Sequence, residues 1–327
     1  MSGTYLVTGG AGYVGGAVAA HLLRAGHRVT VLDDLSTGFR EGVPEGAEFV
    51  EGRVQDAVKW LRPDYDAVLH FAAFSQVAES VRRPEAYWEN NVGGAMALLS
   101  AMRGAGVGTL VFSSTAAVYG EPAGDRVTET DPTVPTSPYG ASKLAVDHMI
   151  TGMAAAHGLG AVSLRYFNVA GAYGAQGERH DPESHLIPLV LQVAQGRREA
   201  ISVYGDDYPT PDGTCVRDYI HVADLAEAHL LALDAATPGE HLICNLGNGA
   251  GFSVRQVIET VRQVTGHPVP EVVAPRRSGD PAVLVASADL ARERLGWRPS
   301  RPDLADIVAD AWEFAQRRAE GEASPPR

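Results

Sequence analysis

Short runs of β-branched and other apolar residues alternate with longer stretches of mixed character through the first half of the chain. The short runs predict β-strands at residues 5–8, 28–33, 47–51, 67–70, 109–113 and 161–166. The longer stretches, at residues 13–25, 84–104 and 138–157, have the length of helices that cover a sheet. Such alternation is typical of α/β proteins, so we predict a Rossmann-like, doubly wound parallel sheet.

The second half of the chain is less regular, with long loops and short helical patterns such as residues 253–265. We expect a first domain over residues 1–168 and a smaller, mixed α/β domain over residues 169–327. Residues 217–233 again have the pattern of a strand followed by a helix. The chain is therefore expected to rejoin the first domain at about 215–235.

Composition and charge narrow the class of protein. A chain of 327 residues has the length of one large or two moderate domains, and 45% hydrophobic with 20% charged residues is ordinary for a globular protein. The formal net charge of −13 repels polyanions, so no nucleic-acid partner is expected. Two cysteines, Cys215 and Cys244, are too few for a disulfide framework, which favours the cytoplasm. The nearest candidate for a membrane span, residues 149–164, is interrupted by glycines and shorter than the roughly 20 residues required, so no membrane partner is expected.

Three glycines, Gly9, Gly12 and Gly15, lie between the first predicted strand and the first predicted helix. In this context the first permits a tight turn, the second lets backbone N–H groups approach a pyrophosphate, and the third lets helix and strand pack closely. Asp33 ends the second strand, where its carboxylate can accept hydrogen bonds from adenine ribose hydroxyls and repel a 2′-phosphate. The pattern predicts NAD in preference to NADP; a purely structural glycine turn is the alternative.

Tyr139 and Lys143 are four residues apart near the start of a predicted helix, so their side chains share one face. A phenol has a pKa of about 10, and a nearby ammonium together with an oxidised nicotinamide would favour its phenolate, which makes Tyr139 a candidate acid–base group. Thr115 follows a strand at the carboxyl edge of the sheet, where its hydroxyl can bind a substrate alcohol. The alternatives are an exposed helix pair and a threonine that bonds turn backbone groups.

Further motifs accompany these residues. The glycine loop, Asp33, Ser113-Ser114-Thr115, Tyr119-Gly120, Pro138-Tyr139-Gly140-x-Ser142-Lys143 and Arg165-Tyr166-Phe167-Asn168 together resemble the extended short-chain dehydrogenase/reductase family. Residues 208–214, 216–222 and 275–281 narrow the resemblance to the NAD-dependent UDP-hexose 4-epimerases of that family. The similarity runs from about Thr4 to Pro299, nearly the whole chain.

The resemblance implies a tightly held NAD and a UDP-sugar substrate. In such an enzyme Tyr139 would remove the proton from the hexose 4-hydroxyl while C4 gives hydride to the nicotinamide. The resulting 4-keto sugar would turn over in the pocket and receive the hydride on its other face, which converts UDP-galactose into UDP-glucose. Lys143 would also bind the nicotinamide ribose, and Thr115 would orient the 4-hydroxyl.

The same resemblance implies two sets of ligand contacts. Arginine suits the diphosphate of the substrate, because its fork binds phosphate oxygens bidentately. Cofactor contacts are expected from Gly9, Gly12, Tyr13, Val14, Gly15, Asp33, Asp34, Leu35, Ser36, Thr37, Gly38, Arg53, Val54, Phe71, Ala72, Ala73, Ser75, Asn90, Lys143 and Phe167. Substrate contacts are expected from Thr115, Tyr139, Asn168, His185, Leu186, Tyr204, Arg217, Tyr219, Arg277, Asp280 and Leu284.

Four positions differ from the pattern of the family. Arg53 stands where many relatives have an aspartate directed at the adenine ring, and Ser75 replaces a lysine found in some relatives. His185 occupies the place of a common asparagine, and both residue types can donate to phosphate. Leu284 lies where some relatives have a tyrosine in the hexose pocket. Its shorter side chain would leave room for a 2-acetamido group, so activity on UDP-N-acetylhexosamines is a further hypothesis.

Other functions fit the sequence less well. A nucleotide-sugar 4,6-dehydratase would have an Asp-Glu pair directly after Thr115, where Ala116 and Ala117 stand. A non-catalytic NAD-sensing protein would typically have lost Tyr139 or Lys143. Epimerases of uronates or pentoses stay open as alternatives, because their pockets differ by few residues.

A metal site and the oligomeric state complete the expectations. His180 and His185 lie five residues apart with a proline between them, which matches no familiar metal-ligand spacing, so no metal is predicted. Residues 94–99 and 149–153 place small and apolar faces on the two helices that pair subunits in the family, so a homodimer is expected by resemblance.

Overall fold

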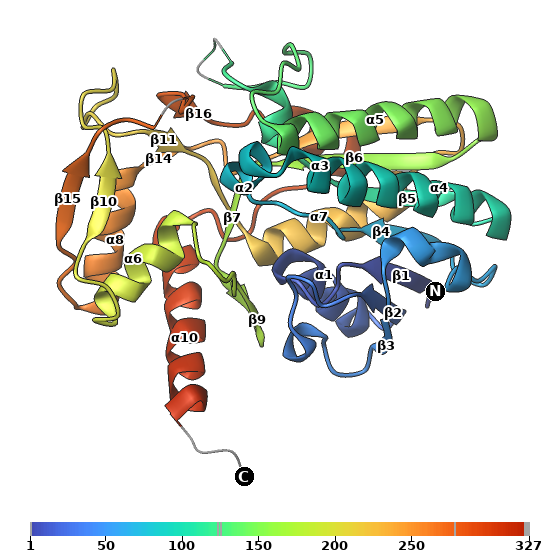
Figure 1. The fold of residues 1–327 in the computed structure, drawn as a ribbon, viewed down its shortest axis with the longest axis horizontal. Coiled ribbons are helices and arrows are strands. Elements are labelled where there is room, and N and C mark those ends of the chain that lie inside the picture. The colour runs from blue at the N-terminus through green and yellow to red at the C-terminus, as the bar shows by residue number, and fades with distance from the viewer. Residues whose placement is uncertain (1, 123, 125, 278, 324–327) are drawn as a thin grey trace.

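A central sheet of seven parallel strands dominates the computed structural model, which describes residues 2–122, 124, 126–277 and 279–323 (Figure 1). The strands follow the spatial order β13-β6-β5-β4-β1-β2-β3. They are β1 (Thr4–Thr8), β2 (Arg28–Asp33), β3 (Glu48–Glu51), β4 (Ala67–His70), β5 (Thr109–Thr115), β6 (Gly160–Tyr166) and β13 (His241–Leu246). The order reverses between β1 and β4, where open sheets of this kind form a ligand crevice at the carboxyl ends of their strands. The predicted α/β fold class is confirmed.

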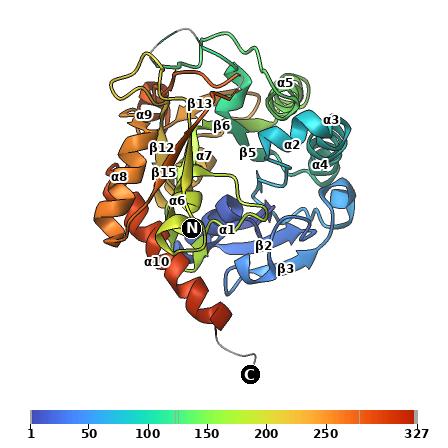
Figure 2. The same cartoon turned by 60° about the vertical axis from the view of Figure 1, so that its left-hand side comes forward.

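Helices cover both faces of the sheet because alternate strand residues point to opposite sides. Val7 of β1 belongs to a core with α1 (Tyr13–Arg24), α7 (Val222–Ala235) and α9 (Asp289–Leu295). The neighbouring Leu6 belongs to a second core with α4 (Gly94–Ala105) and α5 (Pro138–His157). Figure 2 shows α4 and α5 together on the side of the molecule away from α8 and α10. The sheet therefore has apolar side chains on both of its faces.

Two predictions about elements need correction. The helix expected over residues 84–104 is three segments in the structure, namely α3 (Pro84–Tyr87), the π-helical η3 (Trp88–Gly93) and α4. Asn91 lies within η3, where its side-chain amide donates to the carbonyl of Phe74 at 3.0 Å and accepts from its N–H at 2.9 Å. The strand β13 was not predicted, and it extends the return of the chain to the sheet beyond residue 235.

A second lobe packs against the carboxyl edge of the sheet and contains α6 (Leu186–Ala194), α8 (Val254–Thr265), α10 (Leu304–Ala323), β10 (Ile201–Tyr204) and β15 (Glu271–Ala274). Its own core is formed by buried aliphatic residues such as Val190, Ile258 and Ile307. Short strands connect the lobes: β7 (Asn168–Ala170), β8 (Ala172–Tyr173), β9 (Gln176–Gly177), β11 (Val216–Arg217), β12 (Tyr219–His221), β14 (Phe252–Ser253) and β16 (Val283–Leu284). The remaining elements are η1 (Arg40–Gly42), η2 (Val54–Lys59), α2 (Val77–Arg82) and η4 (Ala116–Tyr119).

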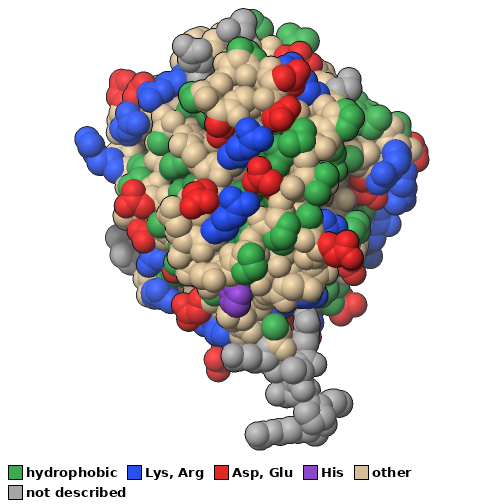
Figure 3. Space-filling view, turned by 90° about the vertical axis from the view of Figure 1, so that its left-hand side faces the viewer, with side chains coloured by type: hydrophobic (Ala, Val, Ile, Leu, Met, Phe, Trp, Pro, Cys, Tyr) green, Lys and Arg blue, Asp and Glu red, His purple; other side chains and the backbone are tan. Residues whose placement is uncertain are grey.

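The outer face of the second lobe carries acidic and basic side chains side by side (Figure 3). Such mixing is typical of a solvated face and differs from the single-sign stripe of a polyanion-binding surface. Within the described residues, no helix has both the length and the apolar character needed to cross a bilayer.

Candidate active site

A cavity of about 460 Å³ runs along the carboxyl edge of the sheet, between the strand ends and the second lobe. The glycine loop after β1 forms one wall, and the ends of β2, β4 and β5 contribute Asp33, Phe71 and Thr115. Asn168 and Leu284 line it from the strands that lead to the second lobe. The cavity therefore lies at the switch point of the sheet, where the strand order predicts ligand binding.

The glycine loop is shaped by contacts that no side chain would permit. Gly9 has a φ of +73°, and a Cβ there would lie 2.5 Å from the backbone nitrogen of Ala72. A Cβ on Gly15 would lie 2.3 Å from the carbonyl oxygen of Gly9. Gly12 is the N-cap of α1, and no side chain caps this helix end. Its free N–H groups and the helix dipole make the loop fit a pyrophosphate group, as in dinucleotide-binding proteins.

Substitution of Gly15 by alanine should weaken NAD binding by about 10- to 100-fold, because the methyl group can be accommodated only if the loop backbone shifts. Gly104→Ala is the matched control, since no atom lies within 4 Å of its added Cβ. Isothermal titration of cofactor-stripped protein measures both affinities. Equal affinity of the two variants would contradict the role given to the close contact at Gly15.

Asp33 holds the loop and faces the cavity. Its Oδ2 accepts the N–H of Ala11 at 3.0 Å, and its Oδ1 accepts the N–H of Leu35 at 2.8 Å. Burial raises the pKa of the Asp33 carboxyl, and the two backbone hydrogen bonds act in the opposite direction. A carboxylate has about four lone-pair positions, so Asp33 can also accept ribose hydroxyls. These contacts fit the prediction of NAD.

Tyr139, Thr115 and Lys143 meet at the end of β5 and the start of α5. Pro138 begins the helix, and Ser137 caps it by accepting the N–H of Gly140 at 3.2 Å. The side chains of Tyr139 and Thr115 both line the cavity. Burial raises the pKa of the Tyr139 phenol, whereas its interaction with the Thr115 hydroxyl lowers it. The start of the helix therefore places the Tyr139 phenol in the cavity beside the end of β5.

Lys143 is buried one helical turn after Tyr139. Its ammonium donates to the carbonyl of Ser113 at 2.7 Å, which anchors it to the end of β5. Burial lowers the pKa of Lys143 to about 8, against the attraction of Asp147. The side chain is 3% exposed, so its charge acts in a medium of low dielectric constant. A charge placed in this way affects the protonation of neighbouring groups more strongly than one in water.

A buried ion pair supports this helix from behind. Asp147 accepts from Arg165 at 2.9 Å, and their side chains are 2% and 5% exposed. Asp147 also accepts from Ser114 at 3.2 Å, and Arg165 donates to the Tyr119 hydroxyl at 3.0 Å. The network ties α5 to β5 and β6 beside the strand residues that hold Thr115 and Lys143.

Most of the predicted cofactor residues line the cavity. Arg53 and Leu35 do not: the Arg53 side chain is 54% exposed and lies 4.0 Å from Glu89, and the Leu35 N–H supports Asp33. The other predicted cofactor residues line it, namely Gly9, Gly12, Tyr13, Val14, Gly15, Asp33, Asp34, Ser36, Thr37, Gly38, Val54, Phe71, Ala72, Ala73, Ser75, Asn90, Lys143 and Phe167.

The predicted substrate residues divide into two groups. One group lines the cavity: Thr115, Tyr139, Asn168, His185 and Leu284. The other group lies behind that wall or beyond it: Leu186, Tyr204, Arg217, Tyr219, Arg277 and Asp280. The second group is joined to the first through the strands, because Tyr219 pairs with Asn168 and Arg217 pairs with Leu284.

Two arginine sites lie in the second group. Arg217 is 3.4 Å from the Asp280 carboxylate and donates to the carbonyl of Pro281 at 2.8 Å. The guanidinium of Arg277 lies 3.8 Å from the centre of the Tyr204 ring. These contacts place both predicted arginines on one side of the second lobe, near the chain segment of Leu284, while Ser278 of the same motif lies outside the described residues.

Some cavity residues were missed by the sequence analysis. Gln55 lines the cavity and donates to Asn90 at 3.3 Å, and Phe74 lines it beside the buried Asn91. Asn91 also donates to Ser142 of the Tyr139–Lys143 motif at 3.1 Å. Gln55 and Phe74 have no local sequence signal, because their placement comes from contacts with η3.

Comparison with known proteins agrees with this geometry. A family model described as "NAD dependent epimerase/dehydratase family" matches residues 5–247. A Streptomyces lividans protein named UDP-glucose 4-epimerase is 72% identical over 326 residues, which cover 98% of each chain. A Corynebacterium glutamicum protein of the same name is 59% identical over 311 residues, or 94% of each chain. The crystal structure of UDP-glucose 4-epimerase from Brucella ovis in complex with NAD is 43% identical, with a TM-score of 0.91 over 95% of this chain and 98% of that one.

Proposed function

Since the chain belongs to the NAD-dependent epimerase/dehydratase family, we propose that it is an isomerase that interconverts UDP-galactose and UDP-glucose at C4. The observation that carries the proposal is the meeting of Tyr139, Thr115 and Lys143 in one cavity with the glycine loop. The cofactor is NAD. The resemblance found in the sequence is confirmed.

The residues of this chain divide the work between binding and proton transfer. The glycine loop would hold the pyrophosphate of NAD, and Asp33 its adenosine ribose. When bound, NAD supplies reversible hydride transfer at C4 of the sugar. Tyr139 takes the proton of the 4-hydroxyl and returns it after the sugar has turned, while Thr115 orients that hydroxyl. The net redox change is zero, because the hydride removed from C4 of the sugar is returned to C4 in the same turnover.

Charge makes this proton transfer possible near neutral pH. Burial raises the pKa of Tyr139, so the apo pocket by itself favours the phenol. A cationic nicotinamide ring and the buried ammonium of Lys143 favour the phenolate. The Lys143 ammonium donates to the Ser113 carbonyl, and this hydrogen bond holds the positive charge of Lys143 at the end of β5.

Leu284 supports a second substrate class, the UDP-N-acetylhexosamines. It lines the cavity from β16 and packs with the cluster of Ala116, Val118 and Phe167. Leu284→Tyr should lower kcat/KM for UDP-N-acetylgalactosamine at least about 10-fold relative to UDP-galactose, because the larger ring fills the space for the acetamido group. Leu284→Met keeps the volume and is the control. An equal loss of kcat/KM for both sugars, or no loss for either sugar, would contradict this role.

The finer features of the protein are part of the proposal. A homodimer would form through α4 and α5, where Met96 is 59% exposed on the outer face of α4. The cytoplasm is the proposed compartment, and the buried, unpaired Cys215 and Cys244 are compatible with its reducing conditions. Sedimentation velocity of the unaltered protein and of Met96→Asp tests the dimer, since a monomeric species is expected only for the variant.

One experiment tests the proposed reaction. Purified protein without added NAD is incubated separately with UDP-galactose, UDP-N-acetylgalactosamine and UDP-glucuronate, and the products are resolved by NMR. Formation of UDP-glucose is expected and would establish the reaction and a retained cofactor together. Turnover of UDP-glucuronate alone would favour the uronate alternative, and no turnover after NAD addition to folded protein would refute the proposal.

A further inference from the structure

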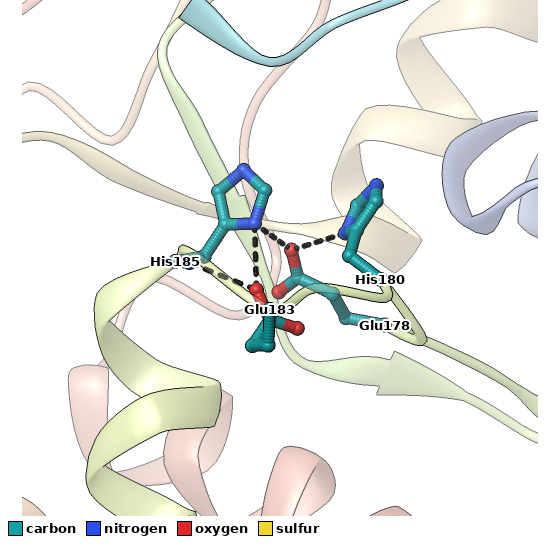
Figure 4. A group of neighbouring side chains, drawn as sticks. All are labelled: Glu178, His180, Glu183 and His185. Atoms are coloured by element: carbon teal, nitrogen blue, oxygen red, sulfur yellow. Dashed lines mark hydrogen bonds and ion pairs between the residues drawn. The ribbon is translucent and has the colours of Figure 1, made fainter. Parts of the chain in front are cut away.

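A cluster of metal-ligating side chains lies on the loop between β9 and α6, outside the catalytic group. We call Glu178, His180, Glu183 and His185 the loop cluster (Figure 4). One donor atom from each residue lies within 4.8 Å of the other three. The cluster stands between two cavities, because the 460 Å³ cavity and a second one of about 350 Å³ beside α6 and α10 share Glu178 and His180.

The donors already converge on one another. The Nδ1 atoms of His185 and His180 lie 2.7 and 3.1 Å from Oε1 of Glu178. Oε1 of Glu183 lies 3.0 Å from the same Nδ1 of His185. In Figure 4 both imidazole rings face the Glu178 carboxylate, and His185 also faces the Glu183 carboxylate. Four donors from four side chains therefore lie close enough together to become ligands of one ion after small movements.

Charge favours a cation at that point. The side chains of Glu178 and Glu183 are only 9% and 8% exposed. Burial of two carboxylates is costly unless positive charge compensates them, and a proton on His185, whose Nδ1 lies 2.7 and 3.0 Å from the two carboxylates, supplies only one such charge. A divalent ion compensates both carboxylates at once and accepts a lone pair from each imidazole.

The donor set and its spacing select the kind of ion. Two imidazoles with two carboxylates suit Zn²⁺ and its neighbours, whereas Mg²⁺ and Ca²⁺ prefer oxygen ligands throughout. Donors about 2.1 Å from a tetrahedral zinc ion lie about 3.4 Å from each other, so the separations of the donors, which are 4.8 Å at most, need adjustments of up to about 1.4 Å. We infer that the loop cluster binds one zinc-type divalent metal ion.

The local structure prepares the ligands for this role. Oε1 of Glu183 accepts the N–H groups of both Ser184 and His185 at 2.7 and 2.8 Å, which fixes the direction of the carboxylate and leaves the lone pairs of Oε2 for an ion. The His185 side chain is 46% exposed and provides an entry path from solvent. The ion would tie the end of β9 to the first turn of α6, and so fix the wall between the two cavities. Sequence spacing predicted no metal, because two histidines five residues apart match no familiar ligand spacing and Glu178 was not counted among the donors.

Metal content and affinity test the inference on the full chain without a histidine tag. Chelator-treated, dialysed protein is titrated with ZnCl₂, and bound metal is counted by mass spectrometry. We expect one zinc ion per chain with a Kd below about 1 μM. His180→Ala and Glu183→Gln should weaken binding by at least about 100-fold, since even an outer-shell partner is worth 10- to 100-fold. The matched controls, His267→Ala and Glu240→Gln, lie outside the loop cluster and should keep the affinity of the unaltered protein.

A spectroscopic readout keeps the test decisive if a variant does not fold. Cobalt(II) bound to the unaltered protein should show the intense visible absorption of a four-coordinate ion with imidazole ligands, and zinc should abolish it. The weak spectrum of hydrated cobalt, or equal zinc affinity in the variants and the controls, would overturn the inference. These readouts need no turnover, so failure of the proposed reaction would leave them unaffected.

Discussion

Replacement of Tyr139 by phenylalanine is expected to lower kcat for UDP-galactose by about 10³-fold, because it deletes the phenol oxygen that we propose exchanges a proton with the 4-hydroxyl. The ring and its contacts stay, including the edge-on contact with Tyr87 at 6.3 Å between ring centres. KM should change little, since the loss concerns the transition state more than substrate binding. Steady-state kinetics with NMR detection of the product measures both constants.

Two further measurements make that result interpretable. Tyr65→Phe removes a phenol oxygen remote from the cavity and should retain the activity of the unaltered protein. Bound NAD should be equal in the Tyr139 variant and the unaltered protein, because the glycine loop and Asp33 are untouched. If the Tyr139→Phe variant retained more than a tenth of the original kcat, the proton transfer would have to be assigned to another group.

Asp147→Ala is expected to lower the free energy of unfolding by about 3–5 kcal/mol, because it leaves the Arg165 guanidinium buried without its carboxylate. Arg165 is 4% exposed, so water cannot take the place of the lost partner. Ser114 loses an acceptor at the same time. Chemical denaturation followed by circular dichroism measures the shift of the unfolding midpoint.

An exposed ion pair and a double variant serve as controls. Glu259→Ala breaks the surface pair with Arg262 and should cost less than about 1 kcal/mol. Replacing both Asp147 and Arg165, as Asp147→Leu with Arg165→Met, should recover much of the loss, since no unpaired charge remains. If Asp147→Ala and Glu259→Ala proved equally mild, the ion pair would not be the support of α5 described above.

Local patterns were enough to predict many elements of the first half. The structure begins and ends β2, β4 and α5 at the predicted residues. Helix α5 has its signals in the sequence, with Ser137 and Pro138 at its start and Gly158, at a φ of +73°, after its end. Strand β13 has no such signals, because its apolar and polar residues do not alternate, and its identity depends on pairing with β6. The π-helical η3 likewise depends on distant contacts of Asn91.

The candidate site likewise contains some residues that local sequence patterns predict and others whose positions depend on contacts distant in the sequence. A local sequence pattern predicts the phosphate-binding loop, because its three glycines, Gly9, Gly12 and Gly15, lie in one short segment. Arg217 and Arg277 came only from the resemblance, and they are not among the residues that line the cavity. Arg217 pairs with Leu284 across β11 and β16, and Arg277 lies over the Tyr204 ring. No local sequence pattern predicts the contacts between η3 and α5.

The late return of the chain to its own sheet has a consequence for synthesis on the ribosome. The core on the α4 and α5 side uses residues from Leu6 to Ala161 and can close early. The opposite core also requires α7, β13 and Trp297, whose buried indole donates to the carbonyl of Asp224 at 2.9 Å. At about 5–20 residues per second, roughly 7 to 27 s separate the synthesis of Ala161, the last residue of the first core, from that of Trp297. A nascent chain therefore passes through a stage with one face of its sheet covered and the other bare, and the duration of that stage sets its exposure to aggregation and its need for a chaperone.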